Sequence, residues 1–181
     1  KSGKLIPGQI ILVHGSNIVD IGSKLSFPSE TEEIDVNGLV AVPGLMDMHV
    51  HYEPWMGPYF LRYGVTRILE MGSFKGPDYI FSIADEIKSR KFPGPLLYMC
   101  GVIFNGSGIP GPPGLGGIQS NNPEVIRKAV EWHLEEGVDF VKVGSENTQE
   151  TLKVVIDLAH SKNRRIYGHI SLVPVDEAID M

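Results

Sequence analysis

From residue 43 onward the chain repeats one pattern: a short apolar run, a loop, and a segment whose apolar residues have helical spacing. The apolar runs predict five strands, at residues 45–49, 64–72, 96–104, 139–143 and 165–170. Helices are predicted near residues 58–63, 78–91, 122–137, from a capping box at 147–150, and over 174–181. Strands that alternate with helices form a parallel sheet covered by helices. The fold class is therefore α/β, as an open doubly wound sheet or a (β/α)₈ barrel.

The positions of the reactive residues favour the barrel. His49, His51, Lys142 and His169 each lie at the C-terminal end of a predicted strand or just past it. This is the end at which (β/α)₈ barrels carry their chemistry. Such a barrel needs about 250 residues, and only five of its eight units are predicted after residue 43. We therefore expect the chain to be the N-terminal part of a longer enzyme, or to be completed by another chain.

The first 42 residues follow a different pattern, with many glycines and short apolar runs but no helical period. Strands are predicted at residues 9–13, 17–21 and 34–42, with tight turns at Gly15, Gly22 and Gly38. We therefore treat residues 1–42 and residues 43–181 as separate domains.

Composition excludes some classes of partner. The net charge of −6 argues against nucleic acid and against an anionic membrane surface, because both need a basic footprint. No apolar run reaches the roughly 18 residues of a membrane-spanning helix. The single cysteine, Cys100, lies inside an apolar run and is expected to be a small buried hydrophobe in a reducing compartment. We expect a cytoplasmic protein with a small-molecule substrate, and a homo-oligomer is compatible with the sequence.

The sequence at residues 49–51 places two histidines one residue apart at the end of a predicted strand. Side chains alternate between the faces of a strand, so His49 and His51 point the same way and can bind one cation together. A pair of histidines without a special role is the alternative. His169, at the end of the fifth predicted strand, adds a third imidazole at the same end of the sheet.

Lys142 is a charged residue in the apolar strand Phe140–Val143, where a charge needs a partner or a task. Burial lowers the pKa of a lysine and leaves a neutral, nucleophilic amine. Such an amine can react with carbon dioxide to form a carbamate, an anion able to bridge two cations. Simple pairing of Lys142 with a carboxylate is the alternative.

Several segments together resemble the amidohydrolase superfamily, most closely its branch of imidazolonepropionases and prolidase-like dipeptidases. They are residues 43–51 (Pro-Gly-x-x-Asp-x-His-x-His), 64–66 (Gly-Val-Thr), 137–143, 159–160 and 168–169. The resemblance runs from about residue 8 to residue 181. It implies a (β/α)₈ barrel over residues 43–181, and it implies that residues 1–42 are the N-terminal part of a small β-sandwich.

The resemblance also implies a site and a reaction. His49 and His51 would hold one divalent metal ion, carboxylated Lys142 would bridge two ions, and His169 would hold the second, with zinc as the expected metal. The reaction is hydrolysis of an amide or other C–N bond, in a cyclic amide or dipeptide-like substrate, by a metal-activated hydroxide. The family further needs a histidine after strand six and an aspartate after strand eight, which are not among the predicted units. By this reasoning the 181 residues alone are expected to be inactive.

Other residues near the motif have two interpretations each. Asp47 could orient a ligand from behind, or be a structural acid hydrogen-bonded to backbone. Tyr52 and Trp55 could bind substrate, or pack. His133 is expected in the core. Residues 106–111 match G-x-G-x-x-G, but Pro112 and Pro113 follow and no helix begins there, so we reject a nucleotide site.

Two further functions compete with the hydrolase. A lyase that forms a Schiff base on Lys142 would fit a barrel-strand lysine, but it leaves three histidines unexplained. A non-catalytic relative could retain the barrel as a scaffold, because fold alone does not determine function.

Overall fold

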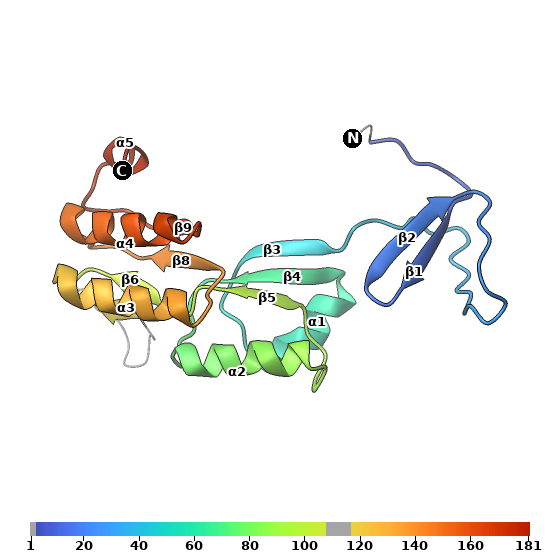
Figure 1. The fold of residues 1–181 in the computed structure, drawn as a ribbon, viewed down its shortest axis with the longest axis horizontal. Coiled ribbons are helices and arrows are strands. Elements are labelled where there is room, and N and C mark those ends of the chain that lie inside the picture. Colours follow the sequence, from blue (N-terminus) through green and yellow to red (C-terminus); the bar gives the residue numbers. More distant parts are fainter. Residues whose placement is uncertain (1–2, 108–116) are drawn as a thin grey trace. The chain divides into compact units, whose positions relative to one another are not determined.

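A computed structural model describes residues 3–107 and 117–181 of the chain (Figure 1). It divides into two units, Lys1–Val42 and Pro43–Met181. Within the described ranges, none of the helices combines the length and the apolar character needed to cross a bilayer.

The first unit contains an antiparallel hairpin of β1 (Ile10–His14) and β2 (Asn17–Gly22), so these two predicted strands are confirmed. Gly15 in the turn has a φ of 60°, which favours glycine there. The strand predicted at residues 34–42 is wrong. That segment is irregular and exposed, and it turns at Gly38, where the Leu39 N–H donates to the Val36 carbonyl. An apolar run becomes a strand only where another strand takes up its backbone hydrogen bonds.

The second unit confirms the alternation of parallel strands and helices. One sheet has the order β3-β4-β5, from Leu45–Val50, Val65–Glu70 and Leu96–Met99. The other has the order β7-β6-β8-β9, from Ile118–Gln119, Ile103–Asn105, Phe140–Val143 and Arg165–Gly168. The helices are η1 (Pro54–Met56), α1 (Gly57–Arg62), α2 (Pro77–Lys88), α3 (Pro123–Glu135), α4 (Gln149–Ser161) and α5 (Val175–Ile179). The described strands form two parallel sheets and not a closed barrel.

The strand predicted at residues 96–104 is split into β5 and β6. Gly101, between the two pieces, has a φ of 78°, which bends the chain out of the extended conformation. As a result β5 pairs with β4, whereas β6 pairs with β8. Asp139, at the entrance of β8, donates its N–H to the Met99 carbonyl and accepts the Met99 N–H on its carboxylate. The bent strand therefore connects the two sheets.

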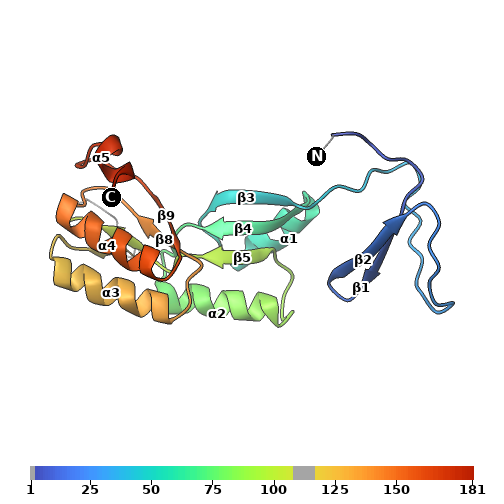
Figure 2. The ribbon, with the colours of Figure 1, turned by 45° about the horizontal axis from the view of Figure 1, so that its top comes forward.

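Helices cover one face of these strands (Figures 1 and 2). Side chains of β3, β4 and β5 pack with α2 in one buried cluster, and side chains of β6 and β8 pack with α3 and α4 in another. The opposite face carries a third, smaller cluster of Leu69, Met71, Cys100 and Phe140. Cys100 is fully buried, and so is His133, whose Nδ1 lies 2.7 Å from the Ala129 carbonyl. Both residues are in the core as expected.

The helix caps agree with the sequence in one case and differ in the other. Asn122 caps α3, since its side chain accepts the Glu124 N–H at 2.9 Å. For α4 the cap is Thr148 and not Asn147. The Asn147 amide instead donates to the carbonyls of Phe104 and Gly144, which ties the start of α4 to the ends of two strands.

Candidate active site

Two of the predicted site residues come from the end of β3. Val50 and Tyr52 are 7% and 3% exposed and pack with the α2 cluster, so His49 and His51 lie on the opposite face of the strand. The ring centroids of His49 and His51 are 5.6 Å apart. Two imidazoles on one tetrahedral zinc ion have centroids roughly 5 Å apart, given Zn–N bonds of about 2.0–2.1 Å. The spacing of these two rings is therefore close to that needed for a shared cation.

The ring of His51 is held in one orientation. Its Nδ1 lies 2.8 Å from the Gly72 carbonyl oxygen, and its ring stacks on Phe74 with centroids 4.5 Å apart. A carbonyl can only accept a hydrogen bond, so Nδ1 must carry the proton. In the neutral ring, Nε2 then keeps its lone pair. This is the arrangement in which a histidine binds a metal through one nitrogen while the other donates to a backbone carbonyl.

His169 follows β9, at the far end of the other sheet. Its backbone N–H donates to the Val143 carbonyl, and its ring centroid lies 6.3 Å from that of His49. If β5 and β6 are counted as one bent strand, four strand spacings separate β3 from β9. At about 4.8 Å each, these spacings would amount to roughly 19 Å in a flat sheet. The strands therefore curve so that the ends of β3 and β9 approach each other.

Lys142 lies in the middle of β8 and is only 4% exposed. Its neighbours in register are Ile103 on β6 and Tyr167 on β9. Burial of the ammonium lowers the pKa of Lys142. A lysine in this environment holds a larger fraction of neutral amine than an exposed one.

Electrostatics link these four side chains. The pKa of His49 is lowered, first by partial burial and then by repulsion from Lys142, His51 and His169; Asp47 acts in the opposite direction. Such repulsion requires that the charges lie near one another. The structure therefore brings the three histidines together, and Lys142 is near enough to contribute to the lowered pKa of His49. A lowered pKa keeps the His49 imidazole neutral, the form that binds metals.

The donor set fits a metal only with Lys142 included. Across residues 3–107 and 117–181, no group of three histidine, cysteine or acidic side chains is arranged to hold a metal ion. An ammonium has no lone pair to give. His49 and His51 can supply two nitrogens, and a carbamate on Lys142 would supply the missing oxygen. Two imidazoles and a carboxylated Lys142 would thus be donor types that a divalent ion takes.

The remaining predicted site residues have different positions. The carboxylate of Asp47 accepts the His49 backbone N–H at 3.0 Å, which is the structural role of the two considered. Tyr52 is in the α2 cluster, and burial raises the pKa of its hydroxyl to about 12. For Tyr52 the expectation of substrate binding is corrected to packing, because it lies on the helix-facing side of the strand. Trp55 is 66% exposed beside Tyr59, and substrate binding by it stays a prediction.

Sequence reasoning missed Glu70, Gly72 and Phe74. Glu70 is fully buried at the end of β4, Gly72 accepts the hydrogen bond from His51, and Phe74 stacks on His51. The sequence did mark Glu70 as a candidate, because Glu70 is a charged residue inside an apolar strand, as Lys142 is. Of the G-x-G-x-x-G motif rejected above, residues 108–111 lie outside the described residues.

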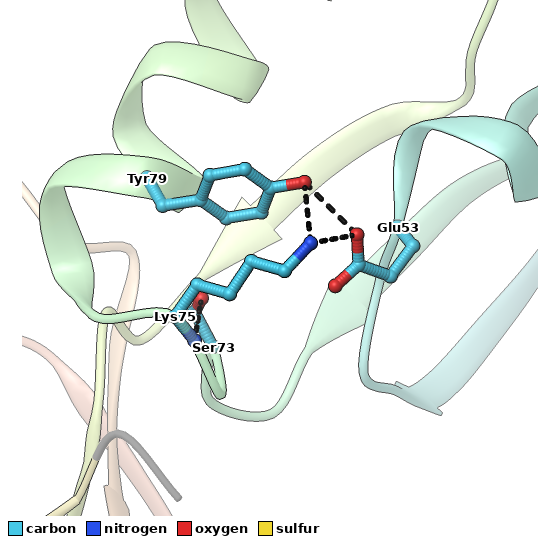
Figure 3. A network of polar contacts seen from close by, with 4 residues as sticks. All are labelled: Glu53, Ser73, Lys75 and Tyr79. Atoms are coloured by element: carbon cyan, nitrogen blue, oxygen red, sulfur yellow. Dashed lines mark hydrogen bonds and ion pairs between the residues drawn. The ribbon is translucent and has the colours of Figure 1, made fainter. Parts of the chain in front are cut away.

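A polar network connects the segments that follow β3 and β4 (Figure 3). The Lys75 ammonium donates to the Glu53 carboxylate at 2.8 Å, and the Tyr79 hydroxyl donates to the same oxygen at 2.9 Å. The Lys75 backbone N–H donates to the Ser73 hydroxyl at 3.1 Å. These contacts fix the segment that carries Gly72 and Phe74 relative to the segment after His51.

Comparison with known proteins finds short sequence matches and longer structural ones. No family model matches the chain. A dihydroorotase of Geobacter metallireducens is 49% identical over 41 residues, which is 23% of this chain and 10% of that protein. An adenine deaminase of Edwardsiella ictaluri is 38% identical over 55 residues, which is 30% of this chain and 9% of that protein.

Solved structures share the fold over most of the chain. An amidohydrolase matches 90% of this chain with a TM-score of 0.76 and 19% identity, and a Xaa-Pro dipeptidase with bound methionine matches 95% with a TM-score of 0.72 and 21% identity. A putative prolidase from Bifidobacterium longum matches 84% with a TM-score of 0.69 and 24% identity. The matched region spans 51%, 53% and 42% of those chains, respectively. At these identities the likeness is one of fold.

Proposed function

We propose, from the fold that this chain shares with amidohydrolase and dipeptidase structures and from its short match to a dihydroorotase, that it carries part of the active site of a metal-dependent hydrolase. The bond cleaved is an amide or other C–N bond, in a small cyclic amide or a dipeptide-like substrate. One or two divalent ions, with zinc expected, would be held by His49, His51, carboxylated Lys142 and His169. The parallel strands would belong to a (β/α)₈ barrel, and residues 1–42 to a small β-sandwich.

The observation that carries this proposal is the approach of three imidazoles from the ends of β3 and β9, with the buried Lys142 of β8 contributing to the lowered pKa of His49. These elements are far apart in the sequence, and the ring centroid of His49 lies 5.6 Å from that of His51 and 6.3 Å from that of His169. Packing alone does not explain such a cluster, because the charged forms of these side chains repel one another.

The chain's own residues prepare the site in two ways. His51 presents Nε2 because Nδ1 donates to the Gly72 carbonyl. Lys142, whose pKa is lowered by burial, supplies a neutral Nζ that bonds to the carbon of carbon dioxide and loses one proton, which leaves an anionic carbamate. When bound, divalent ions lower the pKa of a water molecule towards neutrality and polarise a substrate carbonyl.

Metal removal from the full-length protein tests the proposal. Treatment with a chelator should abolish hydrolysis on a panel of cyclic amides and dipeptides, and zinc with bicarbonate should restore it. His169→Asn should lower zinc content and activity, whereas His160→Asn, on the exposed side of α4, should change neither. A full-length protein without metal and without hydrolytic activity would contradict the proposal and favour a non-catalytic scaffold.

A further inference from the structure

Glu70 is a buried carboxyl group at the end of β4 with no exposed surface. Its neighbours in the chain, Leu69 and Met71, are buried and apolar. A carboxyl group in such surroundings costs free energy unless hydrogen bonds compensate it.

One oxygen of the Glu70 carboxyl group meets the backbone. Oε1 accepts the Gly72 N–H at 3.1 Å, whereas the buried Oε2 has no hydrogen-bond partner among the described residues. Gly72 also holds the carbonyl that orients the His51 ring. Glu70 is thus bonded to the backbone of the residue whose carbonyl faces that histidine.

Gly72 is suited to transmit this constraint. Its φ is 119°, a conformation that other residues rarely adopt, and a Cβ there would lie 2.5 Å from the Ile103 side chain. The flanking N–H groups of Met71 and Ser73 donate to the carbonyls of Val50 and Gly101. Glu70 therefore holds the Met71–Gly72 peptide, while Gly101 holds the Gly72–Ser73 peptide, which carries the Gly72 carbonyl.

We propose that Glu70 is a positioning residue for His51: through its hydrogen bond with the Gly72 N–H it holds the backbone of Gly72, whose carbonyl selects the Nδ1–H tautomer and presents Nε2 to the candidate site. The consequence for metal binding rests on the proposed function, whereas the selection of the tautomer does not. Outer partners of metal-binding histidines commonly contribute 10- to 100-fold in affinity.

Three variants of the full-length protein separate the roles of Glu70. Glu70→Met has a similar volume but no acceptor for the Gly72 N–H. Glu70→Asp keeps the carboxyl group but withdraws it by one methylene. Glu70→Gln keeps a side-chain oxygen at the same reach, and is the matched control. Circular dichroism establishes that each variant is folded before it is compared.

Nitrogen-15 NMR of the metal-free protein reads the tautomer directly. The unchanged protein and Glu70→Gln should hold His51 as the Nδ1–H tautomer, whereas Glu70→Met and Glu70→Asp should give a mixture with Nε2–H. Zinc affinity, measured by competition with a chelating dye, should fall about 10- to 100-fold in Glu70→Met and Glu70→Asp, and should be retained in Glu70→Gln.

The outcomes distinguish this inference from the proposed function. An unchanged His51 tautomer in a folded Glu70→Asp or Glu70→Met variant would overturn the positioning role. If the tautomer shifts as expected but no version of the protein binds zinc, the positioning role stands and the proposed function fails. A loss of the tautomer in Glu70→Gln equal to that in Glu70→Met would also contradict it, because the acceptor is retained there.

Discussion

At the scale of single residues, Lys142 decides between catalysis and packing. Met has a similar length and no charge, so Lys142→Met removes the cost of burying an amine. We expect the free energy of unfolding in urea to change by less than about 1.5 kcal/mol. Hydrolysis by the full-length protein should fall at least about 100-fold, since loss of a ligand exceeds loss of an outer partner. Lys153→Met, on the exposed surface of α4, is the control. Full activity of Lys142→Met would rule out a carbamate.

Glu70 should give the protein a characteristic pH dependence of stability. Burial raises the pKa of Glu70 to about 8, against an unfolded value near 4.5. Between these values the folded state binds a proton that the unfolded state has released, so stability falls as pH rises. Stability should therefore be greatest below about pH 4.5 for this group and be lost progressively up to about pH 8.

Comparison with Glu70→Gln isolates that contribution. The unfolding free energies of the unchanged protein and of Glu70→Gln are measured by urea denaturation from pH 5 to pH 8. Over this range the unchanged protein should lose stability relative to Glu70→Gln. Because His133 and all other groups are common to the two proteins, their titrations cancel. A difference that does not vary with pH would mean that Glu70 has an ordinary pKa.

At the scale of elements, the bend between β5 and β6 depends on Gly101. A Cβ at Gly101 would lie 2.6 Å from the His133 ring, in addition to the strain of a φ of 78°. Gly137 has a φ of 86° but nothing within 4 Å of its Cβ position, so it isolates the strain. We expect Gly137→Ala to cost about 1–2 kcal/mol, and Gly101→Ala to cost about 1–3 kcal/mol more through overpacking. Equal costs in thermal denaturation would show that the contact with His133 yields freely.

The same bend shows where sequence reasoning ends. Most strands and helices of residues 43–181 follow from apolar periodicity, because most of these elements bury one face, whereas η1 and β7 were not predicted. The break at Gly101 did not, since Cys100 and Val102 on either side are as apolar as a strand requires. The site shows a similar division. The alternation of side chains along a strand predicted that His49 and His51 lie on one face. The role of Gly72 as hydrogen-bond acceptor for His51 depends on backbone conformation, which residue types alone do not reveal.

At the scale of the whole molecule, β3 and β9 each have one unpaired edge in the described part of the chain. Three apolar side chains of β3, those of Leu45, Met46 and Met48, are 43–58% exposed. If a barrel is completed in the full-length protein, the outward amides of β3 and β9 should exchange slowly with deuterium there, and quickly in the 181 residues alone. Equally fast exchange in both would contradict barrel closure.

The central claim is that His49, His51, Lys142 and His169 share divalent metal ions. Anomalous diffraction at the zinc absorption edge, on crystals of the full-length protein grown with zinc and bicarbonate, tests it most directly. We predict a zinc peak bound by His49 and His51, with additional density for a carboxyl group on Lys142 Nζ. Zinc peaks that avoid these side chains, or a bare Lys142 amine beside a fully bound ion, would contradict it.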